Sequence, residues 1–196
     1  MSFMERNIKD STVIIVLAIC VFSAGIILGS VCLMHTNAEA SKSLEMYLSE
    51  FFKASQSQIN PHTVFKNALK ENLIYFDVVF IAGFFRIGLV FIAGVLVRKG
   101  FIIGFTSAAF IKFYGIKGML VTVSMLPGTV LLVPAFLFLS TVSADLSVHR
   151  AKKEKNFLIY YIFFALAVIS IFCVSALAEG YLTTTFMKML SPKIIN

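Results

Sequence analysis

The stretch VIIVLAICVFSAGIILGSVCLM at residues 13–34 decides the fold class, because it is uncharged throughout and long enough to cross a bilayer as one helix. At about 1.5 Å per residue, a helix of this length spans a hydrocarbon core of about 30 Å. The run is too long for the apolar region of a cleaved signal peptide, so we interpret it as a retained first span. It contains Gly25 and Gly29, whose G-x-x-x-G spacing allows another helix backbone to approach closely, although the pair could also arise by chance.

Long apolar runs recur along the whole chain of 196 residues, of which 59% are hydrophobic. A soluble domain has about 45–50% apolar residues. The net charge of +7 comes from Lys and Arg residues that flank the apolar runs, and this placement suits lipid headgroups rather than nucleic acid. The three cysteines show no C-x-x-C spacing and indicate small buried residues rather than a disulfide or a metal site. We therefore predict one integral membrane domain over residues 1–196, with lipid as a partner and no nucleic acid.

The fold class predicted from these runs is all-α, a polytopic membrane helix bundle of about five transmembrane helices. Arg98-Lys99-Gly100 is interpreted as a loop, and Gly115 and Gly118 are predicted to mark a turn. The fourth span should be broken or kinked at Pro127, inside the bundle, where protein can satisfy the freed backbone groups. Glu179-Gly180-Tyr181 is expected to end the last span. The predicted spans are residues 13–34, 73–97, 101–114, 118–145 and 157–178.

Residues 35–72 form the longest polar stretch, and its middle is amphipathic. Apolar side chains recur there with helical spacing, at Leu44, Tyr47, Leu48, Phe51 and Phe52. We expect a helix that lies in the membrane interface. A second helix should start at Asn60-Pro61 and continue into the next span. Lys and Arg are packed most densely in the short loops on the N-terminal side, so the N-terminus should be cytoplasmic and this amphipathic segment and the C-terminus extracytoplasmic.

Few residues in the chain are candidates for chemistry. Arg86 falls near the middle of a predicted span, where it should face protein, water or a carboxylate. Asp77 lies on the opposite side of the same predicted helix, so Glu179 is the candidate partner, unless Glu179 is only an interfacial residue. Asp145 and His149 are interpreted as a helix-end pair. No phosphate-binding loop, nucleophile elbow or zinc motif occurs, so we predict no catalytic residue, no metal site, no cofactor and no enzymatic activity.

Several ordered segments resemble the stage II sporulation protein M family of spore-forming bacteria, and they cover nearly the whole chain. They are Tyr47-Leu48-Ser49-Glu50-Phe51-Phe52, Lys99-Gly100-Phe101 with Gly104-Phe105, Gly118 with Leu126-Pro127 and Pro134-Ala135-Phe136, and Glu179-Gly180-Tyr181-Leu182 with Met187-Lys188. Two positions depart from the family pattern. Gly128-Thr129 stand where the family often has glutamine and asparagine, and Gly180 stands where alanine is expected.

The resemblance implies a non-catalytic scaffold for peptidoglycan hydrolases in forespore engulfment. The implied partners are stage II sporulation proteins D and P, and the implied location is the septal or engulfing membrane of the mother cell. A transporter or permease component is the alternative, motivated by the Pro127 break and the charges of Arg86 and Asp77. Whether the chain forms a homo-oligomer is left open. The candidate structural or partner-binding residues are Arg86, Lys99, Gly100, Gly104, Pro127, Pro134, Glu179 and Tyr181.

Overall fold

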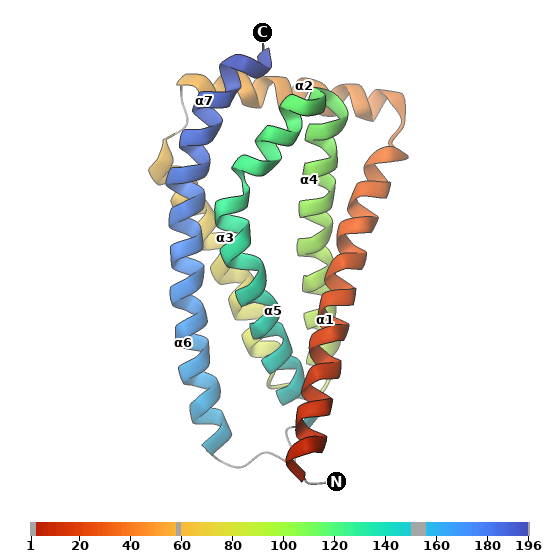
Figure 1. Cartoon of the computed structure of the whole chain (residues 1–196), viewed down its shortest axis with the longest axis vertical. Coiled ribbons are helices and arrows are strands. Elements are labelled where there is room, and N and C mark those ends of the chain that lie inside the picture. Colours follow the sequence, from red (N-terminus) through yellow and green to blue (C-terminus); the bar gives the residue numbers. More distant parts are fainter. Residues whose placement is uncertain (1–2, 58–59, 150–155, 196) are drawn as a thin grey trace.

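The computed structural model describes residues 3–57, 60–149 and 156–195, and within these ranges nearly every residue is helical and none lies in a strand. Most helices run lengthwise in one bundle, α1 begins at one end of it, and α7 ends at the other (Figure 1). The elements in chain order are α1 (Phe3–Met34), α2 (Ala38–Ser57), α3 (Pro61–Ala82), α4 (Gly88–Ser124), α5 (Leu126–His149), α6 (Asn156–Leu177), the π-helical turn η2 (Ala178–Thr183) and α7 (Thr184–Ile195).

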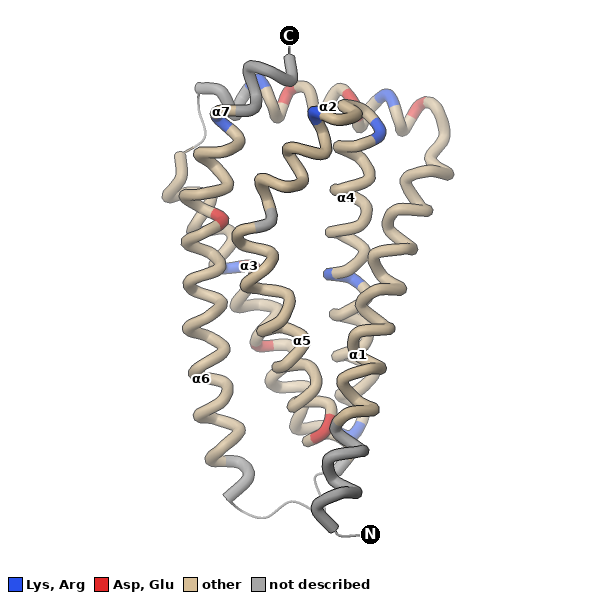
Figure 2. Tube along the Cα trace, viewed as in Figure 1, with Lys and Arg blue, Asp and Glu red and all other residues tan. Residues whose placement is uncertain are grey.

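The prediction of an all-α polytopic membrane bundle is confirmed. Four stretches of the described chain are long and apolar enough to cross a membrane: Thr12–Met34, Gly88–Ser124, Pro127–Val148 and Ile159–Met189. Helix α3 runs lengthwise beside them (Figure 1), but it carries more charged residues than such a stretch allows, at Lys66, Lys70, Glu71 and Asp77. Among the residues coloured in Figure 2, charged positions gather at the end of the bundle where α2 lies, and others are scattered along its length. The expected number of about five is therefore approximate.

The predicted continuous helix over residues 73–97 is wrong, because α3 ends at Ala82 and α4 begins at Gly88. The chain turns between them, where the Gly88 amide donates to the Phe85 carbonyl at 3.0 Å. A Cβ at Gly88 would overlap the Ala82 carbonyl group, so glycine lets the two helices meet at this tight turn. The predicted loop at Arg98-Lys99-Gly100 is also wrong, since these residues lie inside α4.

A second reversal occurs at Gly115, where the turn was predicted. Its φ of 55° is a left-handed conformation that glycine adopts without the steric penalty of a side chain. A Cβ at Gly118 would overlap the Phe110 carbonyl oxygen, so residues 116–124 fold back along the helix that precedes Gly115. The short span predicted over residues 101–114 is therefore the second half of a longer helix that begins at Gly88.

The predicted break near Pro127 is confirmed. Helix α4 ends at Ser124, and α5 begins at Leu126. Pro127 thus occupies the first turn of α5, where its missing amide hydrogen leaves no helix hydrogen bond unmade. The predicted end of the last span at Glu179-Gly180-Tyr181 is wrong, because η2 and α7 continue the helix to Ile195.

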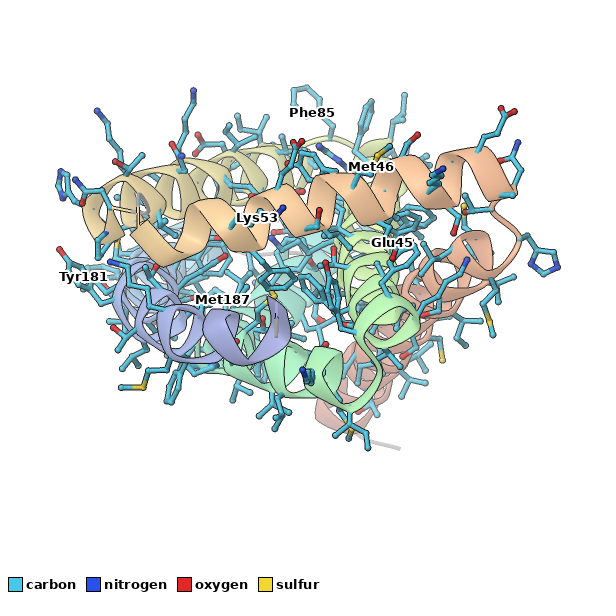
Figure 3. All side chains as sticks on the ribbon, turned by 90° about the horizontal axis from the view of Figure 1, so that it is seen from above. Glu45, Met46, Lys53, Phe85, Tyr181 and Met187 are labelled. Atoms are coloured by element: carbon cyan, nitrogen blue, oxygen red, sulfur yellow. The ribbon has the colours of Figure 1, made fainter. Side chains whose placement is uncertain are left out.

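The amphipathic helix is present as α2, which lies across the end of the bundle (Figures 1 and 3). Phe52 is fully buried, and its ring packs 5.8 Å from that of Phe110 and 5.0 Å from that of Tyr114. Leu48 is buried with it, whereas Tyr47 is 66% exposed. The bundle therefore covers part of the apolar face of α2, and its position in the membrane interface stays a prediction.

Candidate functional site

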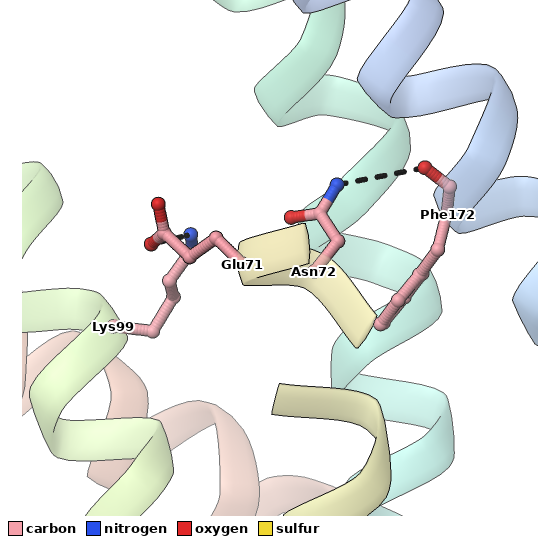
Figure 4. Close-up of polar contacts among 4 residues, drawn as sticks. All are labelled: Glu71, Asn72, Lys99 and Phe172. Atoms are coloured by element: carbon pink, nitrogen blue, oxygen red, sulfur yellow. Dashed lines mark hydrogen bonds and ion pairs between the residues drawn. The ribbon is translucent and has the colours of Figure 1, made fainter. Parts of the chain in front are cut away.

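Helices α3 and α4 bring charged side chains together about halfway along the bundle. Lys99 follows the start of α4 by about 11 residues, which places it about 16 Å from that end, and Figure 2 shows a basic patch midway along α4. The Lys99 ammonium donates to Glu71 Oε1 at 3.2 Å (Figure 4). It also lies 4.7 Å from the ring centre of Tyr75, and the guanidinium carbon of Arg98 lies 5.6 Å from the same ring.

The burial of these groups explains why they pair. The Lys99 side chain is only 12% exposed, and that of Glu71 is 53% exposed. An unpaired charge at this depth of a membrane is costly, so the ion pair and the face of Tyr75 stabilise the ammonium. Glu71 and Tyr75 are four residues apart on α3 and therefore lie on one face of that helix.

The same level of the bundle holds two more polar groups, Asn72 and Glu179. Asn72 is 2% exposed, and its Nδ2 donates to the Phe172 carbonyl of α6 at 3.5 Å (Figure 4). Glu179 is partly buried in η2 and lies within electrostatic reach of both Lys99 and Glu71. The cluster that we call the mid-bundle polar cluster therefore consists of Glu71, Asn72, Tyr75, Lys99 and Glu179.

Glu179 lies in the π-helical turn η2. Such turns occur often at functional sites. A Cβ at Gly180 would lie 2.5 Å from the Cβ and 2.8 Å from the Cα of Phe65, so only glycine allows η2 to pack this closely on α3.

The first turn of α5, just after the helix break, packs against Glu179. A Cβ at Gly128 would lie 3.1 Å from the Cβ of Glu179. The Gly128 carbonyl accepts a hydrogen bond from the Ser175 hydroxyl at 2.9 Å. This bond ties the first turn of α5 to α6. Pro127 itself is partly buried.

The predicted close approach at the G-x-x-x-G pair is confirmed. Gly25 and Gly29 of α1 pack against the backbone of α4, and Gly100 and Gly104 of α4 pack against the backbone of α1. A Cβ at Gly104 would lie 2.8 Å from the carbonyl carbon and 2.9 Å from the Cα of Ile26. In this structure Gly100 and Gly104 therefore hold two helices together, and any role in binding a partner stays a prediction.

The remaining predicted residues lie apart from the mid-bundle polar cluster. Arg86 is exposed in the turn between α3 and α4, and the Ser147 hydroxyl donates to its carbonyl oxygen. The prediction that Arg86 lies mid-span is therefore wrong, and the ion pairs of the described residues include none between Arg86 and Glu179. Tyr181 is exposed on η2, and Pro134 is exposed within α5.

Sequence reasoning missed Glu71, Asn72, Tyr75 and Arg98 as members or neighbours of the site. One signal could have revealed the ion pair. Glu71 precedes the end of α3 by about 11 residues, and Lys99 follows the start of α4 by the same number, so the two stand level in the hairpin. That register can be counted only when the turn is placed correctly.

The site offers ion pairing and hydrogen bonding rather than a metal centre. Within the described ranges, no group of three or more His, Cys, Asp or Glu residues is placed to hold a metal ion. The side chain of His149, which we expected to pair with Asp145, lies outside the described residues.

Comparison with protein-family models matches residues 18–184 to the model described as stage II sporulation protein M. The matched region runs from α1 to the first residue of α7 and contains the whole mid-bundle polar cluster. Neither the curated proteins nor the solved structures include a match to the chain.

Proposed function

The chain belongs to the stage II sporulation protein M family and is a sporulation membrane protein, and from this premise we propose that it is a non-catalytic scaffold that holds peptidoglycan hydrolases at the membrane during forespore engulfment. The proposed partners are stage II sporulation proteins D and P. The proposed location is the septal or engulfing membrane of the mother cell.

The observation that carries this proposal is the position of α2 across one end of the bundle. Its buried residues Leu48 and Phe52 fix it to the bundle, while Glu45, Glu50 and Lys53 are exposed. Figure 3 labels Glu45 and Lys53 along this helix. A polar helix fixed at the membrane surface supports a function in which another protein is held there.

We propose that the α2 end is extracytoplasmic. Arg86 lies in the turn at the opposite end, and the sequence between α5 and α6 is short and rich in Lys and Arg, which favours the cytoplasm for that side. Single cysteines in place of Lys53 and Arg86, in a chain without its native cysteines, test this orientation. An impermeant thiol reagent applied to intact cells should label the cysteine at Lys53 and not that at Arg86, and the reverse pattern would refute the proposal.

The scaffold is tested by co-purification from membranes of sporulating cells. Glu45→Lys and Glu50→Lys together replace two exposed acidic side chains of α2 by basic ones and should abolish recovery of both hydrolases. Arg86→Glu is the matched control at the opposite end and should leave recovery unchanged. Unchanged recovery with the α2 variant, or loss of engulfment while both hydrolases keep their normal localisation, would count against the scaffold.

One observation favours a transporter component as the second candidate. The helix break before Pro127 lies beside Glu179, and broken helices next to charged groups form substrate sites in transporters. Solute flux into proteoliposomes, compared between the parent and Lys99→Met, tests this candidate. Flux no greater than in empty liposomes would argue against it.

A further inference from the structure

Three exposed charged side chains, those of Lys70, Glu71 and Arg98, lie at mid-depth on the outside of the bundle. Arg98 of α4 is exposed, and the Glu71 side chain of α3 is 53% exposed. Among the described residues, the Arg98 guanidinium contacts the Tyr75 ring but has no carboxylate within ion-pair distance. Charged groups at this depth face protein or water rather than lipid, so this surface needs a cover that a single chain does not supply.

The surface is formed by the neighbouring helices α3 and α4, and we call it the α3/α4 outer face. Its exposed residues are Lys70, Glu71, Ile74, Gly94, Arg98 and Ile102. A Cβ at Gly94 would have no atom within 4 Å, so a further backbone has room to approach there. The face carries both signs of charge between apolar residues, so Arg98 of one copy can meet Glu71 of another.

We propose that the α3/α4 outer face is the interface between two copies of this chain, related by a two-fold axis along the membrane normal, with Arg98 of each copy paired with Glu71 of the other. Such an axis keeps every residue at its own depth. Arg98 follows the start of α4 by about 10 residues and Glu71 precedes the end of α3 by about 11, so the two differ in depth by about 2 Å.

The chemistry of Glu71 allows the second pairing. Its Oε1 accepts from Lys99 within the chain, and a carboxylate has further acceptor sites on its other oxygen. A guanidinium brings several donors in one plane and binds a carboxylate with two parallel hydrogen bonds. The dimer therefore contains two symmetric Lys99–Glu71–Arg98 groups, each bridging the interface and removing one exposed cation from lipid.

Cross-linking in native membranes tests the geometry. Two differently tagged copies without native cysteines are co-expressed, one with Ile74→Cys and one with Gly94→Cys. These residues are chosen because they lie at nearly the same depth, with a difference of about 3 Å. Oxidation should yield a disulfide between the two tags. In the control, both copies instead carry Phe163→Cys, because Phe163 is 68% exposed and lies on a different helix, α6. Cross-linking no stronger than this control, or cross-linking of Ile74→Cys to a different protein, would overturn the proposal.

Charge reversal tests the pairing itself, with co-purification of the two tags as the readout. A copy with Arg98→Glu should associate with itself at least about tenfold more weakly than the parent, because both pairs become repulsive. A copy with Glu71→Arg and Lys99→Gln should do the same. Mixed together, the two copies regain both opposite-charge pairs, and association should return, which also shows that both fold. A mixture that stays unassociated would refute the Arg98–Glu71 contact.

Discussion

Replacing Gly104 by alanine tests the contact between α1 and α4, on which the rest of the bundle packs. The added methyl carbon would overlap the carbonyl oxygen of Ile26 and would lie 2.8 Å from its carbonyl carbon. Carbon atoms in contact are separated by about 3.5 Å or more, so α1 must move back by at least about 0.7 Å. The obstructing atoms belong to the backbone, so no side chain can rotate away to make room.

The magnitude follows from three effects. Overpacking of a tight interface costs about 1–3 kcal/mol. The hydrogen bond from the Ser30 hydroxyl to the Gly104 carbonyl, now 3.2 Å long, would be stretched beyond bonding distance, which costs about 1 kcal/mol. Alanine in place of a mid-helix glycine returns about 0.5–1 kcal/mol. We expect a net loss of about 2 kcal/mol in the free energy of unfolding.

The assay is reversible unfolding in mixed micelles, in which a denaturing detergent is titrated against a mild one. Gly94→Ala is the matched control, because it lies on the same helix and its Cβ would meet no atom within 4 Å. The control should be neutral or slightly stabilising. A loss below about 0.5 kcal/mol for Gly104→Ala, the usual range for substitutions that disturb no packed contact, would refute the reasoning.

Three further predictions concern the polar cluster, the end helix and the reversal in α4. Lys99→Met should lower the free energy of unfolding by about 2 kcal/mol or more, because it leaves the Glu71 carboxylate unpaired, whereas Lys99→Met with Glu71→Met should stay near the parent; a double-mutant cycle measures the coupling, and additive losses would contradict it. Phe52→Ala should cost about 3–5 kcal/mol and loosen α2, since the ring is fully buried; limited proteolysis between α2 and α3 should accelerate, unlike in the exposed control Met46→Ala. Gly115→Ala should cost about 1 kcal/mol through its backbone conformation alone, because no atom lies near its Cβ; an unchanged unfolding midpoint would show that the reversal does not require glycine.

The helices themselves could be predicted because their cause is local. A long apolar run predicts a spanning helix, as at residues 13–34, and helical spacing of apolar residues predicted α2. The break before Pro127 follows from the missing amide hydrogen of proline. Gly115 was recognisable as a turn for a similar reason, since glycine permits backbone angles that other residues avoid.

The turn between α3 and α4 could not be predicted, because most of its residues are apolar and do not stand out from the flanking helices. Arg98 and Lys99 were assigned to a loop because isolated charges are unfavourable inside a membrane. Their actual stability there depends on Glu71 and Tyr75 from the neighbouring helix, a tertiary contact that no local pattern encodes.

The candidate site was predictable to the same limited extent. The spacing of Gly100 and Gly104 is visible in the sequence. Their partner is α1 because the chain reverses twice between the two helices, so that α1 and α4 run side by side in the same direction. Glu179 was recognised as unusual, yet it was assigned to the end of a helix. Its position inside the bundle depends on the π-helical turn, which is held by the contact of Gly180 with Phe65.

The position of α2 has a consequence for the biogenesis of the protein. The residues beneath it come from distant parts of the chain and include Leu33, Val121 and Met187. Met187 belongs to α7, which leaves the ribosome after α1 to α6. The complete docking site for α2 therefore does not exist when α2 itself is made, and α2 reaches its final position only after α7 has been synthesised.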